Sequence, residues 1–463
     1  MITYDFEKAQ GPLYMYVYEC LKNDIIKGKL KENEKLPSKR TFARNNGIST
    51  ITIQNAYDQL ISEGYIYTIP KKGYYVSHIE HMVSEPKKLD IHYKINMTPK
   101  RHYHIDLSDN GINSDNFPFS VWTRLSREVM ANKKKELMTI SPVNGVYSLR
   151  EAIAKHLQSF RGMLVDPNQI VVGAGTEFLY GILMELLGKE HIFAIENPGY
   201  KKLEKIYNQK GIRCRYVSMD DYGMSIDSLK KSKADVAHIC PNHHFPTGIT
   251  MPASRRYEIL AWANEQENRY IIEDDYDSEF RTKGHPLPTL FSIDGCEKVI
   301  YINTFSKSLT PTIRISYMVL PLHLANLFYE KMSFYACTVS NFEQYTLAEF
   351  INRGFFEKHI NRMRLYYARQ RKMVIDLINS SDLHHQCLVK ENDSGLHFLL
   401  QLETNQDDIT VKEQLASHSI KIRSLSDYYF TDDKRKEHLF IMNYSNIEKE
   451  KIKKALDIIN NII

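Results

Sequence analysis

Short apolar runs alternate with helical segments over most of this chain, and this alternation limits the possible folds more than any other feature. From about His104 onward the strand-like runs are QIVVGAG, HIFAIE, DVAHIC, RYIIEDDY and KVIYINTF, separated by helical segments such as FLYGILMELL. Strands that are apolar throughout are typical of a parallel sheet buried on both faces. The pattern predicts an α/β domain with a mainly parallel sheet. From about Asn341, long helices followed by GLHFLLQL and HLFIMNY predict a smaller α+β subdomain.

A separate small unit precedes this domain, over residues 11–77. Apolar residues recur at helical spacing after Pro12, Ser38 can cap a second helix, and Ser49 can cap a third that ends at Gly64. The segment YIYTIPKKGYYV then predicts two β-rich runs around a turn, which form a hairpin. Three helices and a hairpin fit a winged helix-turn-helix, although the pattern alone also fits other small helical modules.

Periodicity fades between the two units. Residues 78–103 include the run EPKKLDIHYKINMTPKRHYH, which is rich in Lys, Arg and His. We expect a basic linker there, whose charge either follows DNA or only keeps the linker solvated. A chain of 463 residues is long enough for two or three domains. The predicted organisation is therefore a head at 11–77, this linker, and a body at 104–463.

Composition limits the setting in which such a chain works. Charged residues make up 25% and the formal net charge is +5, which permits contact with nucleic acid without requiring it. The six cysteines stand far apart and lack a metal-ligand spacing with histidine, so we expect reduced thiols and no metal site. We see neither a signal peptide nor an apolar run of membrane-spanning length, and we expect a cytoplasmic protein.

The head carries three motifs in order: LPSKR at 36–40, GISTITIQNAYDQLISEGYI at 47–66 and KKGYYV at 71–76. They resemble the GntR superfamily of bacterial regulators, which implies a winged helix-turn-helix that binds double-stranded DNA. In such a head the third helix enters the major groove with its first turn, where hydroxyl and amide groups meet phosphates and base edges. Basic side chains at the second helix and at the wing tip approach the backbone. The predicted DNA contacts are Ser38, Arg40, Ser49, Thr50, Thr52, Gln54, Lys71 and Lys72.

The body carries five further stretches: NTFSKSLTPTIRISYMVLP, RYIIEDDYDSEF, VVGAGTEFLYGIL, ENPGYKK and PNHHFPTG. They resemble the fold-type I aminotransferases, which hold pyridoxal 5′-phosphate (PLP). The first is NTFSKSLTPTIRISYMVLP, which places Lys307 just after an expected strand, with Thr304 and Ser306 beside it and Arg314 seven residues on. By this resemblance Lys307 forms the Schiff base with PLP. Arg314 pairs with the phosphate, to which a planar guanidinium is suited.

The second stretch, RYIIEDDYDSEF, places a carboxylate at the end of a strand, where α/β sheets bind ligands. The resemblance implies that Asp274 faces the pyridine nitrogen and that Tyr276 bonds the phenolic oxygen. Asp275 is the alternative for the first role. An acidic surface turn is the purely structural alternative for the whole segment.

The third stretch, VVGAGTEFLYGIL, is a strand, a glycine turn and the start of a helix. Gly175, Thr176 and Glu177 can therefore meet the phosphate with backbone N–H groups and a hydroxyl. The family usually has glutamine where Glu177 stands, and a carboxylate suits a phosphate less well.

The last two stretches are ENPGYKK and PNHHFPTG. Tyr200 in the first matches the aromatic residue that stacks on the cofactor ring. The second resembles a segment whose asparagine assists the phenolic oxygen. That asparagine has no clear counterpart here, so Asn242, His243 or His244 must substitute, and we assign His244 to the cofactor site.

Together the two ends resemble the MocR subfamily, in which a GntR head is joined to an aminotransferase-like body. The resemblance implies a homodimeric regulator that binds operator DNA and senses PLP or an amine through an aldimine at Lys307. Two alternatives stay open. One is a working aminotransferase with an accessory DNA-binding head, and the other is a dimerisation scaffold in which PLP binding is vestigial.

Residues for an amino-acid carboxylate help to separate these hypotheses. Aminotransferases clamp the carboxylate with an arginine near the strand that corresponds to HLFIMNYSN, and no arginine stands in it. Lys202 and Arg423 are the best substitutes and become the effector-binding candidates. The tyrosine that crosses to the partner's phosphate in the family corresponds to Thr139 or Ile140. These differences favour a sensor over an efficient catalyst, and we expect no catalytic residues.

Overall fold

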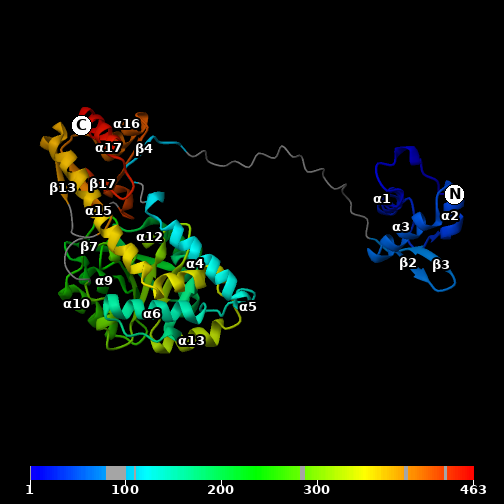
Figure 1. Ribbon diagram of the computed structural model, residues 1–463, viewed down its shortest axis with the longest axis horizontal. Coiled ribbons are helices and arrows are strands. Elements are labelled where there is room, and N and C mark those ends of the chain that lie inside the picture. The colour runs from blue at the N-terminus through cyan, green and yellow to red at the C-terminus, as the bar shows by residue number, and fades with distance from the viewer. Residues whose placement is uncertain (1, 80–100, 109–110, 282–286, 391–394, 432–434) are drawn as a thin grey trace. The chain divides into compact units, whose positions relative to one another are not determined.

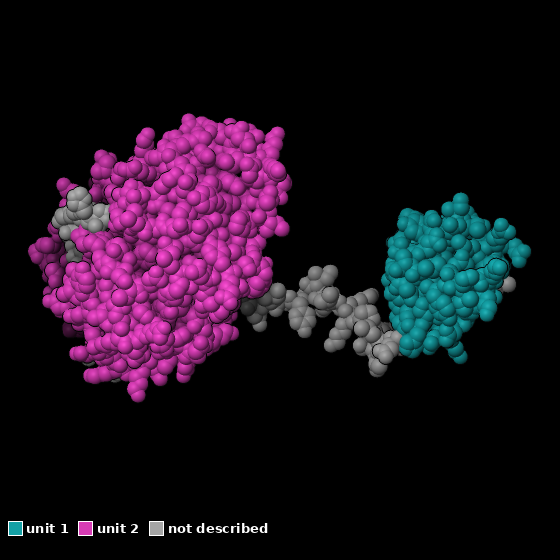
Figure 2. All heavy atoms as spheres, turned by 90° about the horizontal axis from the view of Figure 1, so that it is seen from below, with its two compact units in different colours: residues 1–99 teal, residues 100–463 magenta. Residues whose placement is uncertain are grey.

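The computed structural model divides into two compact units, Met1–Pro99 and Lys100–Ile463, coloured separately in Figure 2. It describes residues 2–79, 101–108, 111–281, 287–390, 395–431 and 435–463. The predicted linker at 78–103 lies mostly outside these residues, so its course stays a prediction. Within the described ranges, no helix combines the length and apolar character that crossing a bilayer requires.

The head is a winged helix-turn-helix, which confirms the prediction from its motifs. Three helices precede a β-hairpin, and the hairpin forms the wing (Figure 1). Its elements are α1 (Leu13–Ile26), α2 (Lys39–Asn46), α3 (Thr50–Ser62), β2 (Ile66–Ile69) and β3 (Gly73–Val76).

Side-chain caps set the boundaries of α2 and α3. Ser38 Oγ accepts a hydrogen bond from the Thr41 amide at 3.2 Å, and Ser49 Oγ accepts one from the Thr52 amide at 3.0 Å. Gly47 ends α2 with φ of 66°, a left-handed conformation that glycine adopts without steric cost. The turn between the two helices is therefore specified by serine and glycine residues that can be recognised in the sequence.

Two parts of the head escape sequence analysis. Strand β1 (Lys35–Leu36) pairs antiparallel with β3 and adds a third strand, but two residues are too few to show a period. The N-terminal segment also belongs to the head, because Tyr4 Oη donates to Asp24 Oδ2 at 2.8 Å and Phe6 packs against the core. The head thus has contacts that begin before residue 11.

The body is built on an eight-stranded sheet in the order β5-β12-β11-β10-β9-β6-β7-β8. Strands β7, β6, β9, β10 and β11 run parallel, β12 is antiparallel to both its neighbours, and β8 is antiparallel to β7. This confirms the predicted α/β class with a mainly parallel sheet. The strands are β5 (Ile170–Gly173), β6 (Ile192–Asn197), β7 (Arg213–Asp220), β8 (Gly223–Met224), β9 (Val236–Ile239), β10 (Tyr270–Asp274), β11 (Val299–Thr304) and β12 (Ser316–Val319).

Helices cover both faces of this sheet. On β11, Ile300 and Ile302 pack in one apolar cluster with α7 and α13, whereas Tyr301 between them packs on the opposite side with α6 and α15. This two-sided burial explains why the strands are apolar throughout. The helices of the body before the subdomain are α4 (Phe119–Asn132), α5 (Lys134–Leu137), α6 (Tyr147–Arg161), α7 (Thr176–Leu187), α8 (Lys201–Gln209), α9 (Ile226–Ser232), α10 (Ala253–Asn264), α11 (Leu290–Ile293), α12 (Phe305–Ser308), α13 (Leu322–Met332) and α14 (Asn341–Asn352).

A smaller α+β subdomain completes the body, as the sequence predicts, but α14 (Asn341–Asn352), expected at its start, packs against α4 and α6 of the large domain. The antiparallel sheet of the subdomain has the order β13-β14-β17-β16, and the long helix α15 connects it to the rest of the body (Figure 1). Strand β4 (Ile105–Asp106) pairs in parallel with β15 (Ile420–Lys421), so the segment that enters the body joins this subdomain. The other elements are α15 (Phe355–Ser380), α16 (Asp408–Ser417), α17 (Lys449–Ile462), β13 (Cys387–Lys390), β14 (His397–Leu402), β16 (Arg423–Ser424) and β17 (Leu439–Asn443).

Candidate functional site

The ends of three strands meet at one edge of the large sheet. Thr304, the last residue of β11, lies opposite Ser316 of β12, which in turn lies opposite Gly173, the last residue of β5. Asp274 ends β10 beside Ile302 of β11. The strand register therefore brings together the segments that follow β5, β10 and β11, although they are far apart in sequence.

A pocket of about 420 Å³ opens at this edge. Its size is within the usual range of a small-molecule site. Both effector candidates, Lys202 and Arg423, line it. The predicted cofactor-site residues on its wall are Thr176, Glu177, Tyr200, His244, Asp274, Tyr276, Thr304, Ser306, Lys307 and Arg314.

Gly175 lies just behind this wall, beneath Arg314. Its φ is 96°, and a Cβ at this position would lie 2.2 Å from Arg314 Nη2. Only glycine therefore allows the guanidinium to lie against the turn at the start of α7. The helix N-terminus and the arginine together form a cradle of the kind that binds anions.

Asp274 keeps one carboxylate oxygen available to the pocket. Its Oδ2 accepts a hydrogen bond from Tyr180 Oη at 2.5 Å and lies 3.5 Å from His238 Nε2. Burial raises the pKa of Tyr180 well above the usual range, so the phenol keeps its proton and donates. Asp274 Oδ1 is buried without a hydrogen-bond partner among the described residues. Such an atom is costly unless a ligand supplies a donor.

Both carboxylate oxygens of Asp275, the alternative, already accept hydrogen bonds. Its Oδ2 accepts from Arg161 Nη2 at 2.6 Å and from Tyr301 Oη at 2.7 Å, and its Oδ1 accepts from Asn242 Nδ2 at 2.7 Å. Asp275 is also absent from the described residues that line the pocket. The geometry therefore favours Asp274 for a contact with a bound ligand.

Of Asn242, His243 and His244, the structure brings only His244 to the described wall of the pocket. Burial lowers the pKa of His244 to about 3, with a further contribution from His243, and burial raises the pKa of Glu196 to about 8. The 3.4 Å approach of His244 Nε2 to Glu196 Oε2 is therefore a contact between two neutral groups at neutral pH. His243 lies 3.3 Å from Tyr276 Oη instead, behind the pocket.

Thr304 and Ser306 play different parts in the local structure. Thr304 Oγ1 caps α12 by accepting from the Ser306 amide at 3.1 Å, and it also accepts from Ser316 Oγ at 2.8 Å. Ser306 Oγ is buried and has no partner among the described residues. The Ser306 hydroxyl therefore remains for a ligand in the pocket, whereas the Thr304 hydroxyl already caps the start of α12.

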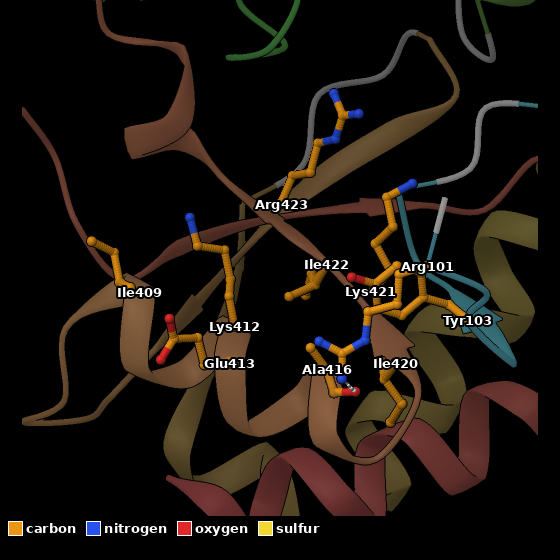
Figure 3. Close-up of a pocket in the computed structure, with 10 residues that line it drawn as sticks. All are labelled: Arg101, Tyr103, Ile409, Lys412, Glu413, Ala416, Ile420, Lys421, Ile422 and Arg423. Carbon is orange, nitrogen blue, oxygen red and sulfur yellow. Dashed lines mark hydrogen bonds between the residues drawn. The ribbon is translucent and has the colours of Figure 1, made fainter. Parts of the chain in front are cut away.

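Arg423 lies on β16 opposite Ile441 of β17, which also lines the pocket. Its Nη1 donates to Tyr428 Oη at 3.1 Å. Strand β17 itself carries no arginine, so the arginine nearest to this part of the pocket wall comes from the neighbouring strand. A second hollow, also of about 420 Å³, shares Arg423 with the pocket and includes Arg101 and Tyr103 near the start of the body. Figure 3 shows Arg423 at one end of that hollow, with its guanidinium turned away from the others.

Two family models match the chain. "Bacterial regulatory proteins, gntR family" covers residues 13–76, and "Aminotransferase class I and II" covers residues 104–459. The Bacillus subtilis protein named "Uncharacterized HTH-type transcriptional regulator YdeL" is 34% identical over 418 residues, 90% of each chain. "Probable rhizopine catabolism regulatory protein MocR" of Rhizobium meliloti is 27% identical over 97% of this chain and 93% of its own length.

This chain belongs to the MocR subfamily of HTH-type transcriptional regulators. "HTH-type pyridoxine biosynthesis transcriptional regulator PdxR" of Corynebacterium glutamicum is a further relative, 30% identical over 89% of this chain and 87% of its own. The fold of the MocR body is that of an aminotransferase. The kynurenine aminotransferase of Pyrococcus horikoshii matches 77% of this chain and 91% of its own with a TM-score of 0.68 and 22% identity, which shows the fold alone.

The head of this regulator places its predicted DNA contacts at its surface. Arg40 lies exposed in the first turn of α2, and Thr50 and Gln54 lie exposed on α3, whereas Thr52 is half-buried. Lys71 and Lys72 are exposed in the turn between β2 and β3. Ser38 and Ser49 are also exposed, but their hydroxyls already cap helices. These two serines therefore have a structural role that does not depend on DNA.

Sequence analysis missed two residues that hold Asp274. Tyr180 lies one helical turn after Thr176 on α7, and this i, i+4 spacing toward the same face was the available signal. His238 lies in β9, the neighbour of β10, where only strand pairing brings it near Asp274. No pattern along the chain indicates that second contact.

The segment at Thr139 and Ile140, where the resemblance predicts the counterpart of a tyrosine that crosses between subunits, lies at the surface. Ile140 is 81% exposed and Met138 is 75% exposed. Thr139 Oγ1 donates to the Lys135 carbonyl at 2.9 Å. Met138 and Ile140 thus present two exposed apolar side chains on one short segment.

Proposed function

We propose that this regulator holds PLP in the pocket at Lys307, and that its affinity for operator DNA changes when PLP or an amine occupies that pocket. The observation that carries the proposal is the buried Oδ1 of Asp274, which lies on the same wall as Lys307 and has no hydrogen-bond partner among the described residues. A protonated pyridine nitrogen is a donor that matches this oxygen. The Gly175 cradle matches the phosphate in the same way.

Named residues would hold each part of the cofactor. PLP supplies an aldehyde that reacts reversibly with primary amines, and Lys307 provides the amine that retains it. Tyr276 keeps its proton, because burial raises its pKa well above the usual range, and so can donate to the phenolic oxygen. Tyr200, 47% exposed on the pocket wall, offers a ring for stacking.

The phosphate end involves a second group of residues. Arg314 lies on the turn at Gly175, where it can pair with the phosphate. Thr176 and Ser306 add hydroxyls from the starts of α7 and α12. Thr176 and Ser306 follow the ends of β5 and β11, and Arg314 precedes the antiparallel β12, so all three lie at the edge of the sheet where ligands bind in α/β folds.

The effector is an amine that carries an acidic group, bound by Arg423. Lys202 is the weaker candidate, because it already pairs with Glu177. Lys421 lies two residues before Arg423. Its Nζ pairs with Asp106 Oδ2 at 2.6 Å, at the start of the body. An effector that draws Arg423 toward the pocket thus acts on the segment through which the head is attached. It can do so only through different affinities for two arrangements of the body.

We infer that the regulator is a homodimer and not an enzyme. The exposed Met138 and Ile140 fit an isologous interface, and two winged heads fit a repeated or palindromic operator. Because strand β17 lacks an arginine at the usual carboxylate position, tight clamping of an amino-acid substrate is reduced. Because the regulator acts on operator DNA, we infer that it works in the cytoplasm, where that DNA lies.

Gel-shift titration with the DNA upstream of the regulator's own gene tests the proposal. We expect the apparent Kd to change at least about fivefold, roughly 1 kcal/mol, when PLP is present or when an amine from a panel is added to the PLP form. Equal affinity in every state would overturn the sensing role. Steady turnover of an amino donor and a keto acid at enzyme-like rates would favour a working aminotransferase instead.

A further inference from the structure

Glu177 bridges two cations at the phosphate end of the pocket. Its Oε1 forms an ion pair with Lys202 Nζ and lies 3.8 Å from Arg314 Nη2. The exposed fractions of the Glu177, Lys202 and Arg314 side chains are 44%, 50% and 47%. An entering ligand can therefore reach all three side chains. The same carboxylate lies in the first turn of α7, where the helix dipole also favours a negative charge.

Arg314 is in place for an anion. A Cβ on Gly175 would lie 2.2 Å from its Nη2 and 2.8 Å from its Cζ, so the guanidinium lies directly over the glycine turn. The side chain is thus seated at the N-terminus of α7, and the negative charge nearest to it among the described ion pairs comes from Glu177. The Glu177 carboxylate therefore partly neutralises the charge of Arg314, as a bound phosphate would.

We propose that Glu177 competes with the phosphate of PLP for Lys202 and Arg314, and so keeps cofactor affinity low enough for occupancy to follow free PLP. This inference rests on the proposed function, because it takes PLP to be the ligand of the pocket. Glu177, Lys202 and Arg314 sum to one positive charge, whereas a bound phosphate brings about two negative charges. A neutral amide at position 177 would leave two positive charges for the phosphate.

Phosphate entry would then exchange one ion pair for another. Lys202 turns from Glu177 to the phosphate, and the Glu177 carboxylate turns to water. Lys202 lies in the first turn of α8, two residues after Tyr200, whose ring lines the pocket. Occupancy of the phosphate site is thereby linked to the segment that carries the stacking residue.

Ligand titrations with the full chain test this inference. Kd values for PLP, and for pyridoxal, which lacks the phosphate, are measured by absorbance for the wild type, Glu177→Gln and Glu177→Asp. We expect Glu177→Gln to tighten PLP binding by about tenfold or more and to change pyridoxal binding by less than about twofold. Glu177→Asp keeps the charge and should stay near the wild type. The gain in Glu177→Gln should shrink as salt rises, because the three side chains are partly exposed.

Glu185→Gln is the matched control, since Glu185 is an exposed glutamate on the same helix. It should change neither Kd. Unchanged or weaker PLP binding in Glu177→Gln, or an equal gain for pyridoxal, would overturn the inference, as would Glu177→Asp behaving like Glu177→Gln. If PLP binds every variant equally, only this inference fails. If PLP binds neither the wild type nor any variant, the proposed function fails with it.

Discussion

The head and the body build their sites in opposite ways. In the head, the candidate DNA contacts are mostly exposed and lie in three short segments, at the starts of α2 and α3 and in the β2–β3 turn. In the body, the candidate ligand contacts come from the ends of β5, β10 and β11, and the central carboxylate of Asp274 is almost fully buried. The head's site is therefore local and tolerant, whereas the body's site depends on the packing of the whole domain.

Removing Lys307 should give the largest effect and should leave the head untouched. We expect Lys307→Ala to lose the absorbance of covalently held PLP, because Lys202, the other lysine on the described wall of the pocket, already pairs with Glu177. The DNA affinity of the PLP-free protein should stay within about twofold of the wild type. Absorbance spectra and gel shifts measure the two effects. Lys331→Ala, a change of an exposed lysine on α13, is the control and should alter neither.

Two glycines with positive φ, one in each region, allow the cost of a Gly→Ala change to be compared between the body and the head. At Gly395, with φ of 80°, a Cβ would lie 1.8 Å from His243 Cε1, whereas at Gly47, with φ of 66°, nothing lies within 4 Å. We expect Gly395→Ala to cost the body about 4 kcal/mol or more, through overlap and backbone strain. Gly47→Ala should cost the head about 1 kcal/mol, through strain alone.

Denaturant unfolding measures this difference with two probes. Both tryptophans, Trp122 and Trp262, belong to the body, so their fluorescence reports the body alone. Loss of DNA binding reports the head. Equal costs at the two glycines would contradict the contrast between a tolerant head and a tightly packed body.

Glu196 tests the buried character of the body through pH. Burial raises its pKa to about 8, so between about pH 4.5 and pH 8 the native state keeps a proton that the unfolded state has released. The wild-type body therefore loses stability as pH rises through this window. Glu196→Gln has no such proton. We therefore expect the unfolding free energy of Glu196→Gln, relative to that of the wild type, to rise by on the order of 3 kcal/mol from pH 5 to pH 9.

Tryptophan fluorescence during urea unfolding of the PLP-free protein measures this dependence. Glu185→Gln, which alters an exposed carboxyl, should show no change in its difference from the wild type over the same range. A constant difference between Glu196→Gln and the wild type would mean that Glu196 is ionised in the native body.

The smallest effect is expected in the head, from Arg40. Its side chain is exposed in the first turn of α2, where we expect it to contact a phosphate. Arg40→Gln should weaken binding several-fold for all DNA sequences alike and lower the salt slope of log K by about one. Lys27→Gln, a charge change at the exposed C-cap of α1, is the control. A loss confined to one DNA sequence would instead assign Arg40 to base contacts.

Sequence analysis recovered much of the fold because most elements carry local signals. The serine caps of α2 and α3, the apolar strands of the large sheet and the segment around Lys307 are each visible in a short window. Strand β1 and the pairing of β4 with β15 were missed, since two-residue strands have no period of their own. The choice between Asp274 and Asp275 also stayed open, because adjacent carboxylates look alike along the chain.

The sequence by itself determined the order of domains, the helix caps, the parallel sheet and the candidate ligand contacts around Lys307, although it missed Tyr180 and His238 on the same pocket wall. Those features depend on backbone propensity and on side-chain periodicity, which act over a few residues. The tertiary structure alone decided that Asp274 lines the pocket, because Arg161 and Tyr301, from distant elements, donate hydrogen bonds to Asp275. It also decided that Glu177 pairs with Lys202, since side chains remote in sequence meet only when packing brings their elements together.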